Sequence, residues 1–195
     1  MKYIVLTLVL FIGTFNAFSQ FENQSSQSDA LASGWSLSAG FNSISSIGDR
    51  NPFGKIGEWG FKNPISVGAE YAWPTGFAIE QSITLNGFSA GDEVDGQELT
   101  EDATYFSTDT AFKYYFGTHI FPEVDWLDLF AGTGFGFFGV DSTNISANLS
   151  GGATFWISEK FGVRLQNVMK FAFDHKNSGI DNNHFQWHLQ GIFRL

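Results

Sequence analysis

The feature that most constrains this chain is a set of eight alternating stretches in which one face carries no charged residue. The stretches lie at 35–42, 65–73, 77–85, 106–116, 129–137, 147–157, 163–173 and 185–195. In the last of them, large apolar side chains and Gly191 occupy every second position from Phe185 to Leu195. A period of two predicts β-strands, because successive side chains of a strand point to opposite faces of the sheet.

The charged residues of these stretches fall on the opposite faces, and they are Glu70, Glu80, Asp109, Lys113, Arg164, Lys170 and Arg194. A soluble barrel has the reverse pattern, whereas a membrane barrel turns its apolar face outward to lipid. Unpaired backbone amides are costly in hydrocarbon, so the last strand must pair with the first. The sequence therefore predicts an all-β protein, an eight-stranded antiparallel up-and-down transmembrane β-barrel over 34–195.

The connections between the predicted strands alternate in length. Long connections at 43–63, 89–103, 141–146 and 174–183 alternate with shorter ones at 74–76, 117–126 and 158–161. Outer-membrane barrels have long outer loops and short periplasmic turns. Both ends of the predicted barrel are therefore expected on the periplasmic side. The connection over 117–126 is longer than this rule predicts. Either it forms a small periplasmic feature, or one of the flanking strands extends further than the pattern indicates.

The first residues have the pattern of a secretory signal peptide, with an early basic residue, an apolar run and a small-x-small motif. We expect a signal peptide over 1–19, with cleavage between Ser19 and Gln20. The apolar run is shorter than the about 20 residues that a membrane-spanning helix needs. The following stretch, 20–33, is rich in Ser, Gln and Asn and is predicted to be a flexible arm.

Composition narrows the possible functions. The chain has 22 Gly, 23 Phe and no Cys, so it has neither disulfides nor thiolate metal sites. The abundance of glycine and aromatic residues is typical of an all-β protein. Its formal charge of −10 argues against binding to nucleic acid, which needs a basic surface.

The inward charges are the first candidate site. The interior of an eight-stranded barrel is just wide enough for side chains to fill, and buried charges persist when they are paired. We therefore expect the seven charged residues above to form a structural ionic network, with a gated narrow pore as the alternative.

Neither the acidic segment nor the histidines predict a metal or cofactor site. The segment 91–102 holds six carboxylates and no basic residue, but its spacing does not match an EF-hand loop. Charge runs of one sign usually stay solvated, so we expect a mobile outer loop. His184 and His188 lie four residues apart on the inward face, about 13 Å at about 3.3 Å per residue, too far to share a metal.

The pattern over Trp35 to Leu195 resembles the small eight-stranded outer-membrane barrels of Gram-negative bacteria, the OmpA-like and OmpX-like families. The glycine-alternating stretch from Phe130 to Gly139 looks like the fifth-strand region of such barrels. The C-terminal Gly191, Phe193 and Leu195 are similar to the assembly signal of that class, although the usual last residue is Phe. The resemblance implies the bacterial outer membrane as location, with its lipid and the barrel assembly machinery as partners.

The resemblance also bears on activity. We expect no C-terminal periplasmic domain, so anchoring to the cell wall is not implied. Lipid A deacylases and palmitoyltransferases share this fold, and a deacylase-like site has Ser and His two residues apart on the lipid face; no His-x-Ser occurs here. The sequence therefore predicts a protein that is not an enzyme.

Several roles remain open from the sequence. The favoured one is a structural or surface-interaction role. The alternatives are an accessory barrel bound to other outer-membrane proteins, a narrow pore, and an OmpW-like conduit for small molecules. A secreted lipocalin-like binder is disfavoured, because the uncharged face would form an apolar surface far beyond a normal patch.

Overall fold

The computed structural model describes residues 33–46, 53–94, 96–140, 142–174 and 182–195. The predicted signal peptide and its cleavage between Ser19 and Gln20 lie outside the described residues, as does the predicted arm over 20–33 except for Ser33. The first described strand begins one residue later, at Gly34.

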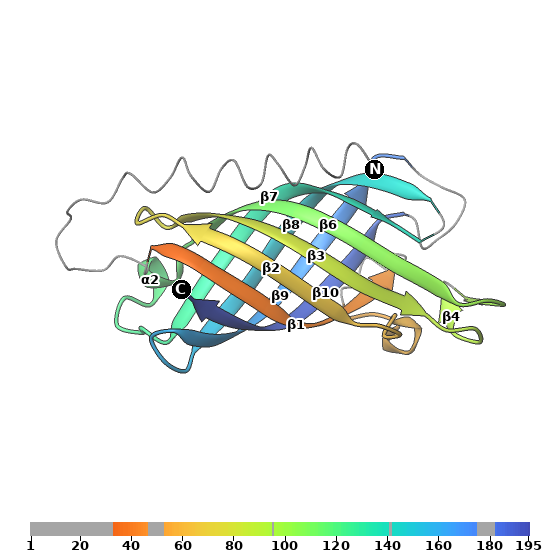
Figure 1. The fold of residues 1–195 in the computed structure, drawn as a ribbon, viewed down its shortest axis with the longest axis horizontal. Helices are drawn as coiled ribbons and strands as arrows, with labels where there is room; N and C mark the ends of the chain where they lie inside the picture. Colours follow the sequence, from red (N-terminus) through yellow and green to blue (C-terminus); the bar gives the residue numbers. More distant parts are fainter. Residues whose placement is uncertain (1–32, 47–52, 95, 141, 175–181) are drawn as a thin grey trace.

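Eight antiparallel strands form one closed barrel and are tilted against its long axis (Figure 1). They are β1 (Gly34–Ser46), β2 (Ile65–Ala72), β3 (Phe77–Phe88), β6 (Ala103–Tyr115), β7 (Leu127–Gly139), β8 (Thr143–Trp156), β9 (Phe161–Ala172) and β10 (His184–Arg194). Each barrel strand pairs with the next one along the chain, and β10 pairs with β1. The predicted fold class and the predicted closure are confirmed, and closure removes the exposed sheet edge that lipid does not tolerate.

Two strands run four residues into connections that the sequence pattern predicted. The connection predicted to start at residue 43 begins only after Ser46, because Ser43–Ser46 continue the ladder with β10. The connection predicted over 141–146 is also shorter, since β8 already begins at Thr143 opposite Gly139. Serine and asparagine interrupt the apolar alternation at both places, so the pattern ends before the hydrogen bonding does.

Short elements occupy three of the connections. The 3-10 helix η1 (Ile56–Glu58) follows β1, and the hairpin of β4 (Glu93–Val94) and β5 (Gln97–Glu98) lies between β3 and β6. The helix α2 (Gly117–Ile120) lies between β6 and β7, so the long connection there is a small folded feature. Among the described residues, no helix is long and apolar enough to cross a membrane.

The two ends of the barrel differ. The end of β10 and α2 lie at one end, and β4 lies at the other (Figure 1). The tight turn closed by the bond from Gly76 N to Trp73 O, 3.1 Å, joins β2 to β3 at the first of these ends. Because short connections of outer-membrane barrels face the periplasm, we call this the periplasmic end and the β4 end the outer end.

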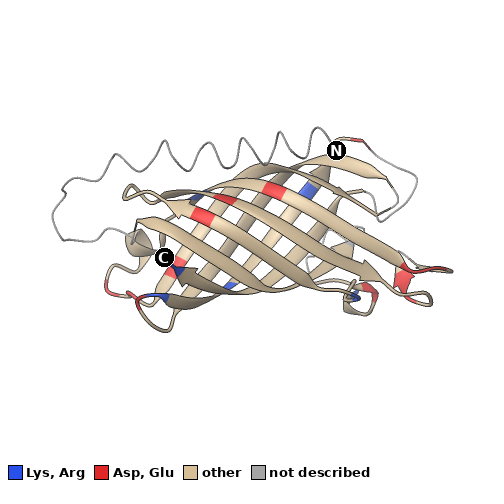
Figure 2. Cartoon of the chain, viewed as in Figure 1, with Lys and Arg blue, Asp and Glu red and all other residues tan. Residues whose placement is uncertain are grey.

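Alternation along the strands separates an apolar outer face from a polar interior. Large apolar side chains of the outer face are exposed, as Phe41 at 67%, Phe135 at 66% and Leu189 at 53% show. Charged residues interrupt the strands at only a few positions, and acidic residues gather on connections (Figure 2). An apolar surface of this extent is far larger than a soluble protein exposes, so the outer face meets lipid.

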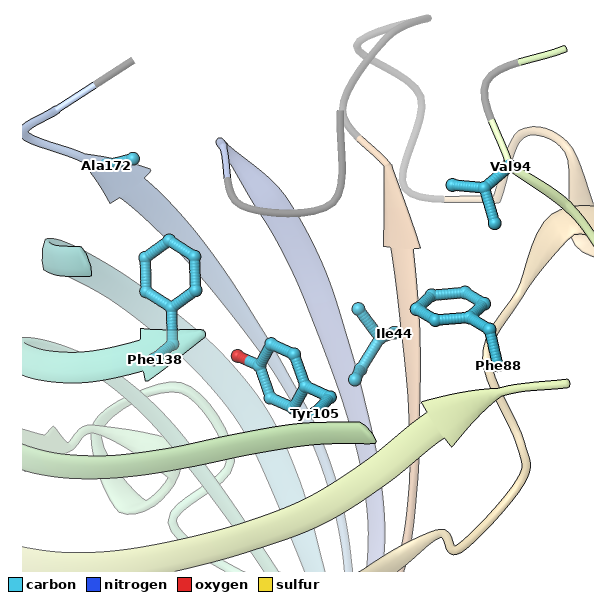
Figure 3. Packing of buried hydrophobic residues seen from close by; sticks show 6 residues of the cluster. All are labelled: Ile44, Phe88, Val94, Tyr105, Phe138 and Ala172. Carbon is cyan, nitrogen blue, oxygen red and sulfur yellow. The ribbon is translucent and has the colours of Figure 1, made fainter. Parts of the chain in front are cut away.

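An apolar cluster fills the interior near the outer end (Figure 3), and its residues are Ile44, Phe88, Val94, Tyr105, Phe138 and Ala172. Val94 belongs to β4, and the partly buried Leu99 packs against the same cluster, so the acidic connection packs onto the barrel through apolar side chains. The sequence predicted a solvated, mobile loop here. Glu93, Glu98 and Glu101 are exposed, as expected for a solvated segment, but the backbone between them is a folded hairpin.

Candidate functional site

Glu70 on β2 and Glu80 on β3 are direct cross-strand partners in the barrel interior. Like charges at such a pair repel each other, and two cations offset the repulsion. Lys113 Nζ lies 3.0 Å from Glu70 Oε2 and 2.8 Å from Glu80 Oε2. Arg164 reaches the same carboxylates, Nη2 at 3.0 Å from Glu70 Oε1 and Nη1 at 2.8 Å from Glu80 Oε1. We call these four residues the four-charge network.

Uncharged side chains complete the four-charge network. Tyr115 donates a hydrogen bond of 2.5 Å to Glu70 Oε1 and accepts one of 2.7 Å from Arg164 Nη2. The ring of Phe130 lies under both cations, with its centroid 4.5 Å from Lys113 Nζ and 5.2 Å from Arg164 Cζ. Buried ions are tolerated when hydrogen bonds satisfy their remaining donors and acceptors. These neighbours therefore offset part of the desolvation cost of burying the network.

A second ion pair lies nearer the outer end. Lys170 Nζ lies 2.6 and 2.7 Å from the two carboxylate oxygens of Asp109. Asn148 Nδ2 donates to Asp109 Oδ1 at 2.8 Å, and Ser107 Oγ donates to Asp109 Oδ2 at 3.1 Å. The ring of Phe138 lies 5.7 Å from Lys170 Nζ. Asp109 thus contacts one cation, whereas each carboxylate of the four-charge network contacts two.

The inner face of β7 makes room for both sets of charges. From Phe130 onward, its residues are Phe130, Gly132, Gly134, Gly136 and Phe138. A Cβ at Gly136 would overlap the carboxylate of Asp109, and one at Gly132 would lie 3.0 Å from Lys113 Cγ. Gly132 and Gly136 therefore leave the space that Lys113 and Asp109 fill, and all three glycines lie on the inner face that the sequence predicted.

Arg194 lies apart from the other six charges, at the periplasmic end. Its Nη2 is 3.6 Å from Asp128 Oδ2, and its Cζ is 3.4 Å from the ring centroid of Trp156. The sequence analysis grouped Arg194 with the interior network, but as the last residue of β10 it reaches only the rim. Asp128 was missed, although it alternates with the outward Leu127 and Leu129 and so could have been recognised as inward.

One of the two interior histidines, His184, makes contacts with neutral groups. His184 Nε2 lies 2.7 Å from Tyr105 Oη, and its Nδ1 lies 2.8 Å from the carbonyl oxygen of Asn182. His188 is also buried. Within the described ranges, no group of three or more His, Asp or Glu side chains is placed to hold a metal ion.

Two carboxylates of the acidic connection bind a neighbouring outer connection and the backbone of their own segment. Asp102 pairs with Lys62 of the preceding outer connection and accepts a hydrogen bond of 3.0 Å from the Ala90 amide. The hydrogen bond from Lys62, helped by the Ala90 amide, lowers the pKa of Asp102. Asp92 accepts a bond of 2.6 Å from the Ser89 amide. These two carboxylates therefore bind groups of the protein itself.

The residues of the predicted assembly signal lie on the outer face at the periplasmic end. Phe193 and Leu195 are exposed, and Gly191 is the cross-strand partner of Ala39 on β1. The amide of Leu195 donates to the carbonyl oxygen of Trp35 at 2.9 Å, which extends the seam between the first and last strands.

The arrangement balances charge inside the lumen. The acids Glu70, Glu80 and Asp109 face the bases Lys113, Arg164 and Lys170, and all six are buried. These six charges therefore bind one another rather than a ligand. The barrel interior is therefore filled by buried salt bridges.

Comparison with known proteins agrees with this architecture at the level of fold. No family model and no curated protein matches the sequence. The crystal structure of Neisserial surface protein A matches with a TM-score of 0.55 and 12% identity, covering 86% of this chain and 100% of that chain. The N-terminal β-barrel domain of Pseudomonas aeruginosa OprF matches with a TM-score of 0.50 and 12% identity, covering 82% and 97%.

The closed eight-stranded barrel, the lipid-compatible outer face and the polar interior define a class of protein. This is the architecture of small bacterial outer-membrane β-barrels of the OmpA-like type. The protein accordingly lies in the bacterial outer membrane, in contact with its lipid. Within that class, the barrel of Neisserial surface protein A is matched over its full length.

Proposed function

We propose that this protein is a non-conducting, non-enzymatic outer-membrane barrel with a structural or surface-interaction role. The observation that supports the proposal is the buried four-charge network of Glu70, Glu80, Lys113 and Arg164. An interior closed by its own ion pairs leaves the outer connections and the lipid-facing surface to meet other molecules.

The energetics of the network argue against conduction. An ion that crosses the lumen has to separate buried pairs, and leaving a buried charge without its partner costs about 3–5 kcal/mol. The six lumen charges also cancel, so the interior presents no excess charge to select an ion. The alternative of an apolar conduit is disfavoured by the same buried charges.

Conductance in a planar bilayer tests this proposal. We expect the wild-type protein to give no discrete current steps after insertion. Arg164→Ala removes the largest fully buried side chain and serves as the opened control, provided that its gel mobility still shifts on boiling as a folded barrel does. Discrete steps from the wild-type protein would favour the narrow pore instead.

The position of the two buried histidines supports a non-enzymatic role. His184 and His188 face the interior, and no described strand position on the lipid face carries a histidine. A general base has to reach the proton that it abstracts, and these imidazoles do not reach lipid. Incubation with lipid A should leave its acyl chains unchanged in mass; loss or gain of a chain would contradict the proposal.

We further propose that the barrel assembly machinery reads Gly191, Phe193 and Leu195. Support comes from their outward position on the strand that closes the barrel. Phe193→Ser should lower the amount of protein recovered in the outer membrane, whereas refolding of the purified variant into detergent should proceed as for the wild type. A parallel loss in both experiments would indicate a role in stability alone.

One observation favours the alternative of an accessory barrel. Phe53, Ile56 and Phe61 of the connection between β1 and β2 are 62%, 64% and 54% exposed. The Phe53 ring packs on Trp187 of β10, with centroids 4.9 Å apart, so this apolar set borders the seam between the first and last strands. We call it the outer apolar pad.

Site-specific photocrosslinking in cells tests the accessory role. A photoreactive residue at position 56 should give one defined protein adduct if the outer apolar pad contacts another outer-membrane protein. The same residue at the exposed position 98, in β5, is the control. Equal labelling at both positions, or labelling of lipid alone at position 56, would leave the structural role as the better proposal.

A further inference from the structure

A groove crosses the rim of the barrel at the periplasmic end. Its volume is about 570 Å³, and Asp125, Trp126, Trp156, Ile157, Glu159 and Arg194 are among the residues that line it. A second cavity, of about 280 Å³, occupies the mouth of the lumen and shares Trp156, Glu159 and Arg194 with the groove. The two hollows therefore meet at these residues, and together they lead from the aqueous mouth over the rim.

Arg194 is held in position where the two hollows meet. Its guanidinium stacks on Trp156, and Trp156 Nε1 donates a bond of 2.6 Å to Asp128. Arg194 Nη1 donates to the carbonyl oxygen of Glu159 at 3.2 Å, and Nη2 lies 3.6 Å from Asp128. The side chain nevertheless stays 24% exposed. A guanidinium fixed in this way is preorganised for an incoming anion, because little side-chain entropy remains to be lost on binding.

The other side of the groove continues into the lipid-facing surface. Trp126 and Ile157 are 52% and 70% exposed. Trp126 stacks on Phe155, an outward residue of β8, with ring centroids 6.1 Å apart. Tryptophan at this level is typical of the boundary between hydrocarbon and water. One ligand can therefore lie with a polar end at Arg194 and an apolar end against Trp126.

Charge in the groove selects among such ligands. Arg194 supplies one cation, and the carboxylates of Asp125 and Glu159 stand exposed along the same groove. A phosphate is attracted by the guanidinium, and an ammonium group is attracted by the carboxylates. A headgroup with a phosphate but no ammonium group, such as phosphoglycerol, keeps a net negative charge and leaves both carboxylates without a cationic partner.

We propose that this groove binds the headgroup of a zwitterionic, phosphoethanolamine-type phospholipid of the periplasmic leaflet. The phosphate contacts Arg194, the ammonium contacts Asp125 and Glu159, and one acyl chain lies along Trp126 and Ile157. The site is independent of the role proposed above, since it needs only the membrane location and this rim.

Native mass spectrometry of the refolded protein in detergent tests the site. We expect one phosphatidylethanolamine to stay bound under conditions that remove other lipids, and phosphatidylglycerol of equal chain length to bind at least about tenfold more weakly. Soluble phosphoethanolamine should not displace the lipid at comparable concentration, because it lacks the acyl chain. Equal retention of the two lipids, or equal potency of the soluble headgroup, would overturn the proposal.

Variants assign the contacts. Arg194→Gln should weaken phosphatidylethanolamine binding about tenfold or more, as expected for a lost hydrogen bond to a charged group. Glu159→Gln, on an exposed turn, should narrow the preference over phosphatidylglycerol. Lys62→Gln removes a cation at the outer end and is the matched control. Each variant is first checked for the heat-dependent gel shift of a folded barrel. Binding unchanged in folded Arg194→Gln and Glu159→Gln would contradict the assignment.

Discussion

The four-charge network and the Asp109–Lys170 pair both neutralise buried carboxylates in the lumen. They differ in the number of cations that each carboxylate contacts. In the network, each of Glu70 and Glu80 contacts two cations. In the pair, both oxygens of Asp109 depend on the single ammonium of Lys170. Each set also rests on one phenylalanine of β7 and uses space left by the glycines between them.

The number of cations around each carboxylate determines how well the filled barrel tolerates the loss of one charge. A buried ion without a partner is costly. When one acid leaves the network, Lys113 and Arg164 still face the remaining acid. When Lys170 leaves the pair, Asp109 keeps only the neutral donors Asn148 and Ser107. The pair is therefore the more vulnerable of the two sets.

The largest effect is expected for Lys170→Met. It leaves Asp109 buried and unpaired, so the free energy of unfolding should fall by about 3–5 kcal/mol. Urea titration in detergent, followed by gel mobility and tryptophan fluorescence, measures this loss. The double variant Asp109→Asn with Lys170→Met removes both charges and should recover most of the stability. A loss below about 1 kcal/mol in the single variant would mean that Asp109 is not dependent on Lys170.

A smaller effect is expected for Glu80→Gln. Both cations of the network keep a contact with Glu70, so we expect a loss of about 1.5–3 kcal/mol, the range for a hydrogen bond to a charged group. The unfolding temperature should fall accordingly in a thermal melt. If this variant lost as much stability as Lys170→Met, redundancy would not distinguish the two sets. An unchanged melting temperature would contradict the buried pairing itself.

Gly136→Ala tests the space on which the pair depends. The added Cβ would overlap the Asp109 carboxylate, which is held by Lys170 and Asn148, so we expect overpacking to cost about 1–3 kcal/mol. Gly151→Ala is the matched control, because its Cβ would meet only the carbonyl oxygen of Phe130 at 3.7 Å. The urea midpoints of the two variants show whether the added methyl group destabilises the barrel at position 136 more than at position 151. Equal midpoints would show that the lumen has room to spare at Asp109.

Much of the fold could be predicted from the sequence because the alternation is strong. An uncharged face on every strand dictates lipid outside, and the cost of unpaired amides dictates closure. The strand ends at Ser46 and Thr143 were misplaced, because polar residues near the outer end break the apolar alternation while the ladder continues.

The pairing within the lumen could not be predicted in the same way. Arg164 and Glu70 are 94 residues apart, and only the closed register of the barrel brings them together. Alternation assigns a side chain to the interior but does not give its position along the barrel axis. For this reason, Arg194 was grouped with charges that it does not reach. Nor does a run of carboxylates reveal that Val94 anchors the hairpin between them.

The smallest effect is expected at Asp102, outside the membrane-spanning strands. Its bonds from Lys62 and Ala90 lower its pKa below the ordinary value of 3.8. A lowered pKa in the folded protein means that the stabilisation is present above the ordinary pKa and is lost as the pH falls through the lowered one. Asp102→Asn should therefore make the β4–β5 hairpin more sensitive to protease at neutral pH and leave the urea midpoint of the barrel unchanged.

The control for this prediction is Glu101→Gln, which neutralises an exposed neighbour in the same connection. It should leave protease sensitivity as in the wild type, because the loss of one acidic charge is the same but the bonds of Asp102 remain. Equal sensitivity of the two variants would mean that overall charge, rather than the Asp102 contacts, holds the hairpin. A shifted urea midpoint in Asp102→Asn would instead mean that the hairpin and the lumen unfold together, so the barrel core would extend through Val94 into the outer connections.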